Sequence, residues 1–198
     1  RLADNSPGSA AGSRTLSILN TGGTLIAGQL LDIDAAQLGG DGSLLSLGDI
    51  TVRLTGDYNH SGVFRAAGNA SLVTAGNIVN RAAMEAGQTL HLSAARITNL
   101  TDATLSGDTT ELNAAVSLLN RGLIDGRETR ISTAELLNAG RGRIYGDHLA
   151  IQASTLVNDK QYGSSATIAA REQLDLGVHT MVNREHALIF SAGDMAIG

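Results

Sequence analysis

The sequence contains no cysteine, no tryptophan and a single proline, Pro7. Without cysteine, the chain has neither a disulfide framework nor a thiolate metal site. Aromatic side chains are scarce too, with three tyrosines and two phenylalanines among 198 residues. Because globular cores draw much of their buried area from aromatic rings, this chain must build its core from Leu, Ile, Val and Ala. That composition favours a narrow, uniform core.

Positive charge and long apolar runs are missing as well. Lys160 is the only lysine and the formal net charge is -5, so no basic surface for nucleic acid or an anionic membrane is apparent. No apolar run is long enough to span a membrane, and residues 1–14 lack the apolar stretch of a signal peptide. We expect no nucleic-acid partner and no stable membrane insertion. Since the chain begins at Arg1, we expect a segment of a larger protein, with residues 1–14 as a connector or a preceding partial coil.

What the sequence does contain is a repeat of about 20 residues. An apolar residue, a variable residue and Asn recur along the chain, and a glycine recurs with the same period. The Asn column comprises Asn20, Asn80, Asn99, Asn120, Asn138, Asn158 and Asn183. The Gly column comprises Gly28, Gly48, Gly68, Gly87, Gly107, Gly126 and Gly146. Gly40 and His60 take the place of Asn in two of the repeats. A fixed period of this length predicts a solenoid over residues 15–198.

Each repeat alternates apolar and polar residues, as in residues 87–94 and 146–153. Such alternation in short stretches bounded by Gly and Asn predicts strands. A second strand precedes each Gly, and the apolar-x-Asn triplet forms a third. Three short strands per repeat predict an all-β parallel β-helix. Coils stack about 4.8 Å apart, so nine coils give a rod of roughly 40 Å.

The two columns have structural explanations. Asn tolerates the left-handed backbone at a corner, and stacked Asn side chains form amide ladders. Glycine is expected wherever a corner needs a positive φ. The alternation also predicts which apolar side chains are buried and stacked. These are Ile18, Ile78, Leu92, Ile97, Leu112, Leu118, Ile131, Leu136, Ile151 and Leu156.

The repeat is interrupted after Asn158. The sequence there predicts an insertion over residues 159–170, and insertions in solenoids map to loops on one face, often the binding face. Its members Lys160, Gln161, Tyr162 and Gly163 form a candidate interaction loop. The alternative is an insertion without a role, or a spacer between two blocks of repeats.

The units at residues 19–28, 137–146 and 182–198 resemble the repeats of filamentous haemagglutinins and of the stalks of contact-dependent inhibition toxins. The resemblance covers residues 15–198. It implies a right-handed parallel β-helix from a large Gram-negative exoprotein that is secreted or held at the cell surface. Such proteins are exported through an outer-membrane partner by two-partner secretion. They act as adhesins for host or neighbouring bacterial cells, or as rods that present a distal toxic domain.

An enzyme is the competing interpretation, because pectate-lyase-like enzymes that act on polysaccharides are also parallel β-helices and a fold does not fix a function. Asp32 and Asp34 both point outward from one predicted strand, which is compatible with paired-carboxylate sugar chemistry. A column of His91, Glu111 and Arg130 is a second candidate, although a cross-strand charge ladder explains it as well. The five histidines show no metal-site spacing. We predict a structural and interaction module without catalytic residues, metal or cofactor.

Overall fold

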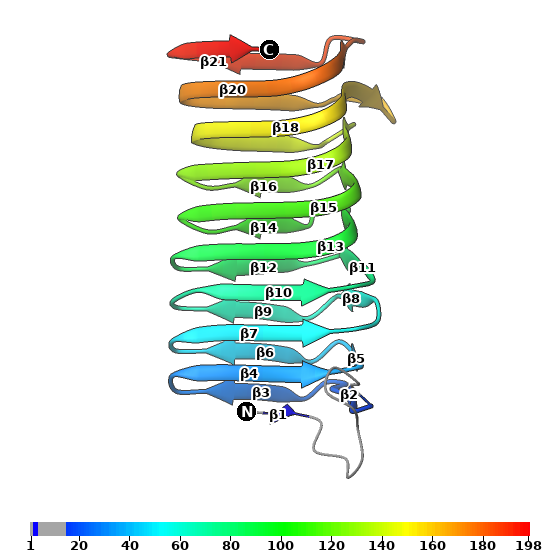
Figure 1. Cartoon of the computed structure of the whole chain (residues 1–198), viewed down its shortest axis with the longest axis vertical. Coiled ribbons are helices and arrows are strands. Elements are labelled where there is room, and N and C mark those ends of the chain that lie inside the picture. The colour runs from blue at the N-terminus through cyan, green and yellow to red at the C-terminus, as the bar shows by residue number, and fades with distance from the viewer. Residues whose placement is uncertain (1, 4–14) are drawn as a thin grey trace.

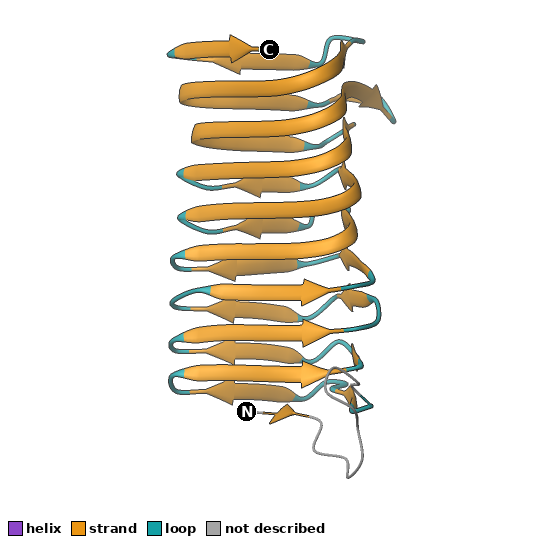
Figure 2. Ribbon diagram, in the orientation of Figure 1, coloured by secondary structure: helices purple, strands orange, loops and turns teal. Residues whose placement is uncertain are grey.

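The computed structural model describes residues 2–3 and 15–198. The predicted connector over residues 1–14 therefore lies outside the described residues, except for β1 (Leu2–Ala3). Every regular element of the described residues is a β-strand, and the strands form about nine coils of about 20 residues each (Figures 1 and 2). The predicted parallel β-helix is confirmed. Front strands run left to right and back strands right to left while the chain rises from the N-terminus, so the coil is right-handed (Figure 1).

Three parallel sheets surround the core, and we name them from their place in Figure 1. The front sheet contains β4 (Leu30–Ala35), β7 (Asp49–Leu54), β10 (Ala70–Thr74) and β22 (Asp194–Ile197). The side sheet contains β2 (Ser17–Leu19), β5 (Gln37–Gly39), β8 (Tyr58–His60) and β11 (Asn77–Asn80). In it β2 pairs with β5 and β8 pairs with β11, but β5 and β8 are not paired with each other. The back sheet contains β3 (Thr24–Ala27), β6 (Ser43–Ser46), β9 (Val63–Ala66), β12 (Ala83–Ala86), β14 (Thr104–Ser106), β16 (Leu123–Asp125) and β21 (Leu188–Ser191).

Later coils contain longer strands than the sequence predicts. Front and side strands join into one bent strand in β13 (Thr89–Asn99), β15 (Thr109–Asn120) and β17 (Glu128–Ala139). In β18 (Arg143–Gln161) and β20 (Thr167–Asn183) the back strand joins as well. The expectation of three separate strands per coil was wrong for these coils. Their corners lie at small register shifts, such as that between Ala94 and Arg96, which bend the strand without breaking the ladder.

The core consists of stacked aliphatic columns. In the side sheet, Ile78 pairs with Ile97, Ile97 with Leu118, and the column continues through Leu136 to Leu156. In the front sheet, Leu92, Leu112, Ile131 and Ile151 form a second column. All of these side chains are buried, as predicted, whereas Ile18 in the first coil is half-buried. Residues of similar size therefore lie on top of one another at the density that a narrow core needs.

The explanation proposed for the Gly column was wrong. None of the seven column glycines has a positive φ; the glycines that do are Gly22, Gly40, Gly140 and Gly163. Most of the column glycines are needed because the neighbouring backbone is close. A Cβ on Gly48 would lie 2.1 Å from the Gln29 carbonyl oxygen, and one on Gly87 would lie 2.1 Å from that of Ala67. At Gly28 a Cβ would meet nothing within 4 Å.

Gly28 is the exception because the pairing of Leu2 with Ile33 leaves no residue of this sequence opposite it on the N-terminal side, where Gly48 and Gly87 meet their neighbours. Its register with the second coil also differs. The pairing of Ala27 with Ser46 and of Leu30 with Asp49 places Gly28 opposite Leu47, and Gly48 opposite Gln29. The first coil therefore carries its glycine one position out of line with the second.

The Asn column forms a hydrogen-bonded amide ladder at the corner between the side and back sheets. Each Asn Nδ2 donates to the Oδ1 of the Asn one coil further on, over 2.8–2.9 Å, from Asn80 through Asn99, Asn120, Asn138 and Asn158 to Asn183. Each also donates to a carbonyl of the back sheet, as Asn120 does to Arg143 at 3.2 Å. Asn20 is separated from this ladder by Gly40 and His60, but it makes the same contact with the Ser43 carbonyl. The ladder thus satisfies amides that have no water available to them.

Candidate functional site

The insertion after Asn158 is a short β-hairpin that projects beyond the outline of the coils (Figure 1). Lys160 pairs with Ser165 and Gln161 with Ser164 of β19 (Ser164–Ser165), in antiparallel register. Tyr162 and Gly163 form the two-residue turn, with φ of 50° and 82°, as in the type I′ turns that suit the twist of a hairpin. Since β20 begins at Thr167, residues 167–170 belong to the coil and the insertion is narrower than expected.

The hairpin is held on both of its strands by arginines from earlier corners. Arg121 donates from Nε to Gln161 Oε1 at 2.6 Å, and Arg143 donates from Nη1 to the Ser165 carbonyl at 3.1 Å. Ser165 Oγ donates to the Glu185 carbonyl at 2.8 Å on the following coil. These contacts leave Tyr162 at the tip, 91% exposed. The insertion therefore presents one aromatic ring on an ordered support.

The base of the hairpin is closed by an ion pair. Arg184 donates from Nε and Nη2 to Asp159 Oδ2 at 3.0 and 2.8 Å. The pair lowers the pKa of the Asp159 carboxyl, chiefly through the hydrogen bond from Arg184. Ala166 N also donates to the Asp159 carbonyl at 3.2 Å, so the two ends of the insertion lie in contact. The chain leaves and re-enters the coil at one point.

The carboxylates of Asp32 and Asp34 point outward on either side of the buried Ile33, as predicted. Both face Arg53 on the next coil, with Arg53 Nη2 at 2.5 Å from Asp32 Oδ1 and Nε at 3.9 Å from Asp34 Oδ2. The single guanidinium thus contacts both carboxylates, closely at Asp32 and more loosely at Asp34. This arrangement resembles a structural ion pair, not the acid and base of a glycosidase.

The second candidate column also has the register predicted for it. His91 pairs with Glu111, and Glu111 with Arg130. His91 Nδ1 lies 3.4 Å from Glu111 Oε2, and Arg130 contacts both Glu111 and Glu128, at 3.4 and 2.6 Å. Exposed pairs of this kind contribute a few tenths of a kcal/mol each. The column is a surface charge ladder.

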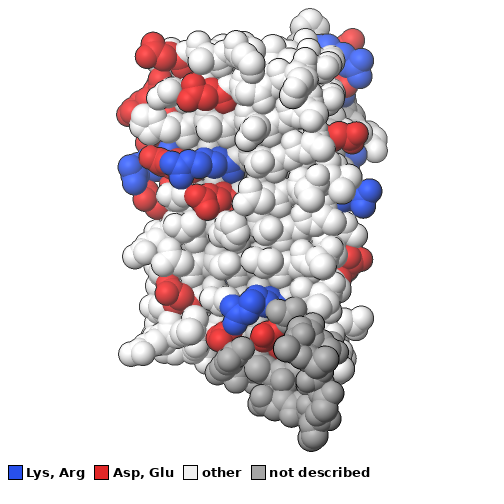
Figure 3. All heavy atoms as spheres, viewed as in Figure 1, with Lys and Arg blue, Asp and Glu red and all other residues white. Residues whose placement is uncertain are grey.

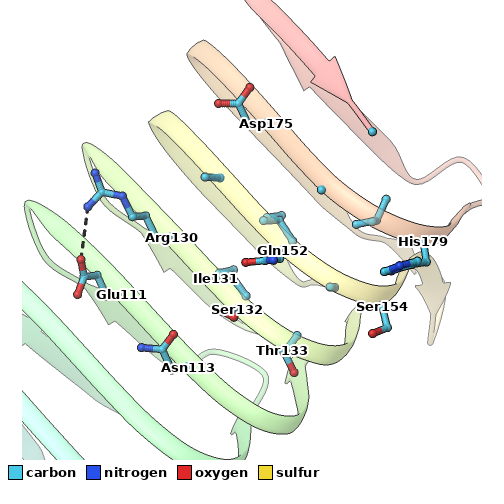
Figure 4. A pocket seen from close by; sticks show the side chains of 16 residues that line it. Glu111, Asn113, Arg130, Ile131, Ser132, Thr133, Gln152, Ser154, Asp175 and His179 are labelled. Carbon is cyan, nitrogen blue, oxygen red and sulfur yellow. Dashed lines mark hydrogen bonds and ion pairs between the residues drawn. The ribbon is translucent and has the colours of Figure 1, made fainter.

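A shallow depression of about 960 Å³ lies on the front sheet next to this column (Figure 4). Its polar side chains come from successive coils and lie beside one another without converging. Its acidic members, Glu111 and Asp175, stand three coils apart in one register column, which is about 14 Å. Paired carboxylates in glycosidases lie roughly 5–9.5 Å apart. Most of the front face carries no charged side chain (Figure 3).

Sequence reasoning missed a buried polar pair at the interruption of the Asn column. His60 Nε2 lies 3.0 Å from the Ala83 carbonyl, which can only accept, so Nε2 carries the proton. Nδ1 is then the acceptor for the Tyr58 hydroxyl at 3.3 Å. Burial lowers the pKa of His60, and the bond to Ala83 opposes that shift. Ala83 pairs with Thr104 of the next coil, and the Thr104 carbonyl accepts the hydrogen bond from Asn80. His60 therefore makes, one coil earlier, the contact that an Asn amide makes in the later coils.

The described part of the chain contains neither a cluster of metal-ligating side chains nor a membrane-spanning helix. No three His, Asp or Glu side chains there lie close enough together to hold a metal ion. No helix of a length and apolarity that could cross a membrane occurs among those residues.

The fold and its surface define a β-solenoid whose irregular features are one braced hairpin and scattered ion pairs. Residues 3–39 and 26–82 match the family model of the haemagglutinin repeat. Comparison with curated proteins and with solved structures gave no match. The chain contains a repeat region of the filamentous haemagglutinin type, and the same register continues beyond the matched residues to Asn183. A haemagglutinin repeat on a β-solenoid fits a structural or adhesive stalk segment.

Proposed function

We propose that this chain is a stalk segment of a large exoprotein that a Gram-negative bacterium secretes through an outer-membrane transporter. The parent protein is an adhesin or a carrier of a contact-dependent inhibition toxin. The segment holds binding or toxic domains away from the cell. The observation that carries this proposal is the haemagglutinin repeat on a front sheet whose register runs from coil to coil. Parallel sheets that share one core resist bending, since any bend must disturb all three ladders.

Surface display is tested with antibodies raised against residues 15–198. Intact cells of the bacterium that makes the protein should be labelled without permeabilisation, and protease treatment of intact cells should remove the label. A periplasmic protein of the same bacterium is the control and should be labelled only after permeabilisation. Labelling of the segment only in permeabilised cells would contradict the proposal.

The hairpin is the part of the segment that we propose contacts a receptor on a host or a neighbouring bacterial cell. Its support is the exposed Tyr162 on a braced turn. Deletion of residues 160–164 should leave the coil folded, because Asp159 and Ala166 are already in contact. Binding of the fluorescently labelled segment to cells should fall at least tenfold on deletion and on Tyr162→Ala. Val73→Ala, which removes an exposed apolar side chain on the front sheet, should change nothing. Equal binding by all variants would exclude the hairpin as the contact.

The alternative function is a polysaccharide-acting β-helix enzyme, for which the front depression and the Asp32–Asp34 pair are the sites. We propose that the segment does not catalyse. The support is the distance between Glu111 and Asp175 and the ion pairing of Asp32 and Asp34 with Arg53. Incubation with plant and microbial polysaccharides should release no reducing ends. Turnover that disappears in Asp32→Ala or Asp34→Ala would establish the enzyme instead.

A further inference from the structure

All three surface aromatic side chains of this aromatic-poor protein lie in its last coils. Tyr58 and Phe64 are buried in the core, which leaves Tyr145, Tyr162 and Phe190. Tyr162 occupies the hairpin, whereas Tyr145 and Phe190 stand together on the back sheet. This second grouping has no counterpart in the repeat and no role in the core.

Register places the two rings on either side of one small residue. Tyr145 pairs with Ala169, and Ala169 pairs with Phe190, in parallel register at outward-facing positions. Two strand spacings separate the Cα atoms of Tyr145 and Phe190, which is about 9.6 Å. Because Ala169 supplies only a methyl group between them, the space between the rings is open. Phe190 is 47% exposed, although burying its ring would be favourable.

The space is a defined pocket of about 250 Å³. That is slightly below the roughly 300–1,000 Å³ of pockets that hold drug-sized ligands, so it suits a single ring. Ala192 and Ala170 complete an apolar wall, and Arg171 lies at the rim. Arg171 donates from Nη1 to Asp147 Oδ1 at 2.6 Å, and its side chain is 64% exposed. Its other N–H groups face solvent at the mouth of the pocket.

We propose that this pocket binds one pyranose ring of a glycan chain. A pyranose has two apolar C–H faces, which suit the two aromatic rings, and hydroxyl groups around its edge, which suit the donors of Arg171 and the carboxylate of Asp147. The guanidinium at the rim disfavours an ammonium group between the rings. A flat aromatic ligand that stacked on one of the two aromatic side chains at about 3.5–4 Å would leave a gap between itself and the other. The thicker, puckered sugar ring contacts both.

The pocket and the hairpin are both contacted by residues at the start of β18. Arg143 lies two residues before Tyr145 on β18 and contacts the Ser165 carbonyl of the hairpin. A glycan held between Tyr145 and Phe190 therefore has a path along the back sheet towards Tyr162. A stalk needs no sugar site, so sugar binding by this pocket is independent of the stalk function.

The test uses the whole chain and defined sugar hexamers. The probes are three neutral chains, cellohexaose, maltohexaose and chitohexaose, and one acidic chain, hexagalacturonate. Binding is measured by saturation-transfer NMR and by titration up to 10 mM, which is on the order of the weakest affinity that one sugar ring would give. At least one hexamer should bind, with transfer to the C–H protons of one ring. Phe190→Ala and Tyr145→Ala should each weaken binding about tenfold or more, and Phe190→Tyr should restore it. Val63→Ala, at another outward position of the back sheet, should have no effect.

Arg171→Gln separates the two kinds of sugar. If the guanidinium binds a carboxylate, this substitution should weaken the binding of hexagalacturonate much more than that of the neutral hexamers. If it binds hydroxyl groups, the binding of all four hexamers should weaken equally. Circular dichroism melting curves show whether each variant is folded. Binding of no hexamer, binding unaffected by loss of either ring, or binding of an aromatic or proline-rich peptide in place of sugar would each overturn the proposal. None of these results would change the outcome of surface labelling.

Discussion

At the scale of the residue, the side chains that stabilise the corners do so through contacts with the next coil. Asn120 shows this most clearly, because its amide donates to Asn138 and to the Arg143 carbonyl and accepts from Asn99. It is completely buried. Unpaired buried polar groups cost about 1–3 kcal/mol each. Positions in the Asn ladder should therefore tolerate substitution far less well than their small side chains suggest.

Replacing Asn120 by Ala should lower the free energy of unfolding by about 2–4 kcal/mol, because partners on both neighbouring coils lose a hydrogen bond. Asn20→Ala is the matched control. Asn20 is partly buried and makes one contact, to the Ser43 carbonyl, so its loss should cost about 1 kcal/mol or less. Urea unfolding curves of the two variants measure the difference. Equal effects would show that the ladder adds nothing beyond single hydrogen bonds.

His60 should make the stability of the rod depend on pH. Burial lowers its pKa in the folded state, so below the ordinary value of about 6.5 the unfolded chain binds a proton that the folded chain does not. Stability is therefore complete above about pH 6.5 and is lost as the pH falls towards the folded pKa. The urea midpoint of the wild type should drop between pH 7.5 and 5 by more than that of His60→Asn. The same drop in both proteins would assign the dependence to other groups.

Two glycines of one sequence column should respond in opposite ways to a methyl group. Gly87→Ala forces a Cβ against the Ala67 carbonyl oxygen and should destabilise the protein by several kcal/mol, within the range of overpacked sites. Gly28→Ala meets open space and should be neutral or stabilise by up to about 1 kcal/mol. Thermal melts of both variants check this. A stable Gly87→Ala would show that neighbouring coils separate at this corner without cost.

At the scale of the element, each strand has one buried and one outer row, and the alternation is visible in sequence. The parallel β-helix and its buried columns could be predicted because period-2 alternation and the recurrence of Asn and Gly are local signals. The reason for Gly48 and Gly87 could not, since it depends on a carbonyl of the preceding coil. Contacts such as that between Arg121 and Gln161, 40 residues apart, also leave no sequence signal. The meeting of Tyr145 and Phe190 depends on how many residues the intervening corners contain.

A pair of neighbours on β15 tests the assignment of its two rows. Leu118 is buried and Leu119 faces outward. Leu118→Asp should unfold the surrounding coils, because a lone buried charge costs several kcal/mol. Leu119→Asp should remain folded, with a loss of about 1–2 kcal/mol for the half-buried side chain. Circular dichroism and limited proteolysis distinguish the two. Folding of Leu118→Asp, or unfolding of Leu119→Asp alone, would show that the buried and outer rows of this strand are assigned the wrong way round.

At the scale of the whole molecule, the protein is a rod whose length comes from repeated coils (Figure 1). Its front and back ladders run through all the described coils, whereas the side ladder is interrupted between β5 and β8. The hairpin and the aromatic pocket both belong to the last coils, while the earlier coils carry ion pairs such as Arg53 with Asp32. Contact surfaces are thus added to the rod without interrupting its core.

The central claim is this continuous register, and the absence of native cysteine allows a clean measurement of it. Thr51 and Asp175 belong to one outward column, six coils apart, through Ser71, His91, Glu111, Arg130 and Ala150. With Thr51→Cys and Asp175→Cys both spin-labelled, pulsed electron–electron resonance should give one narrow distance peak near 29 Å, roughly six strand spacings. A broad distribution, or a peak many ångströms from that value, would contradict a single rigid β-helix.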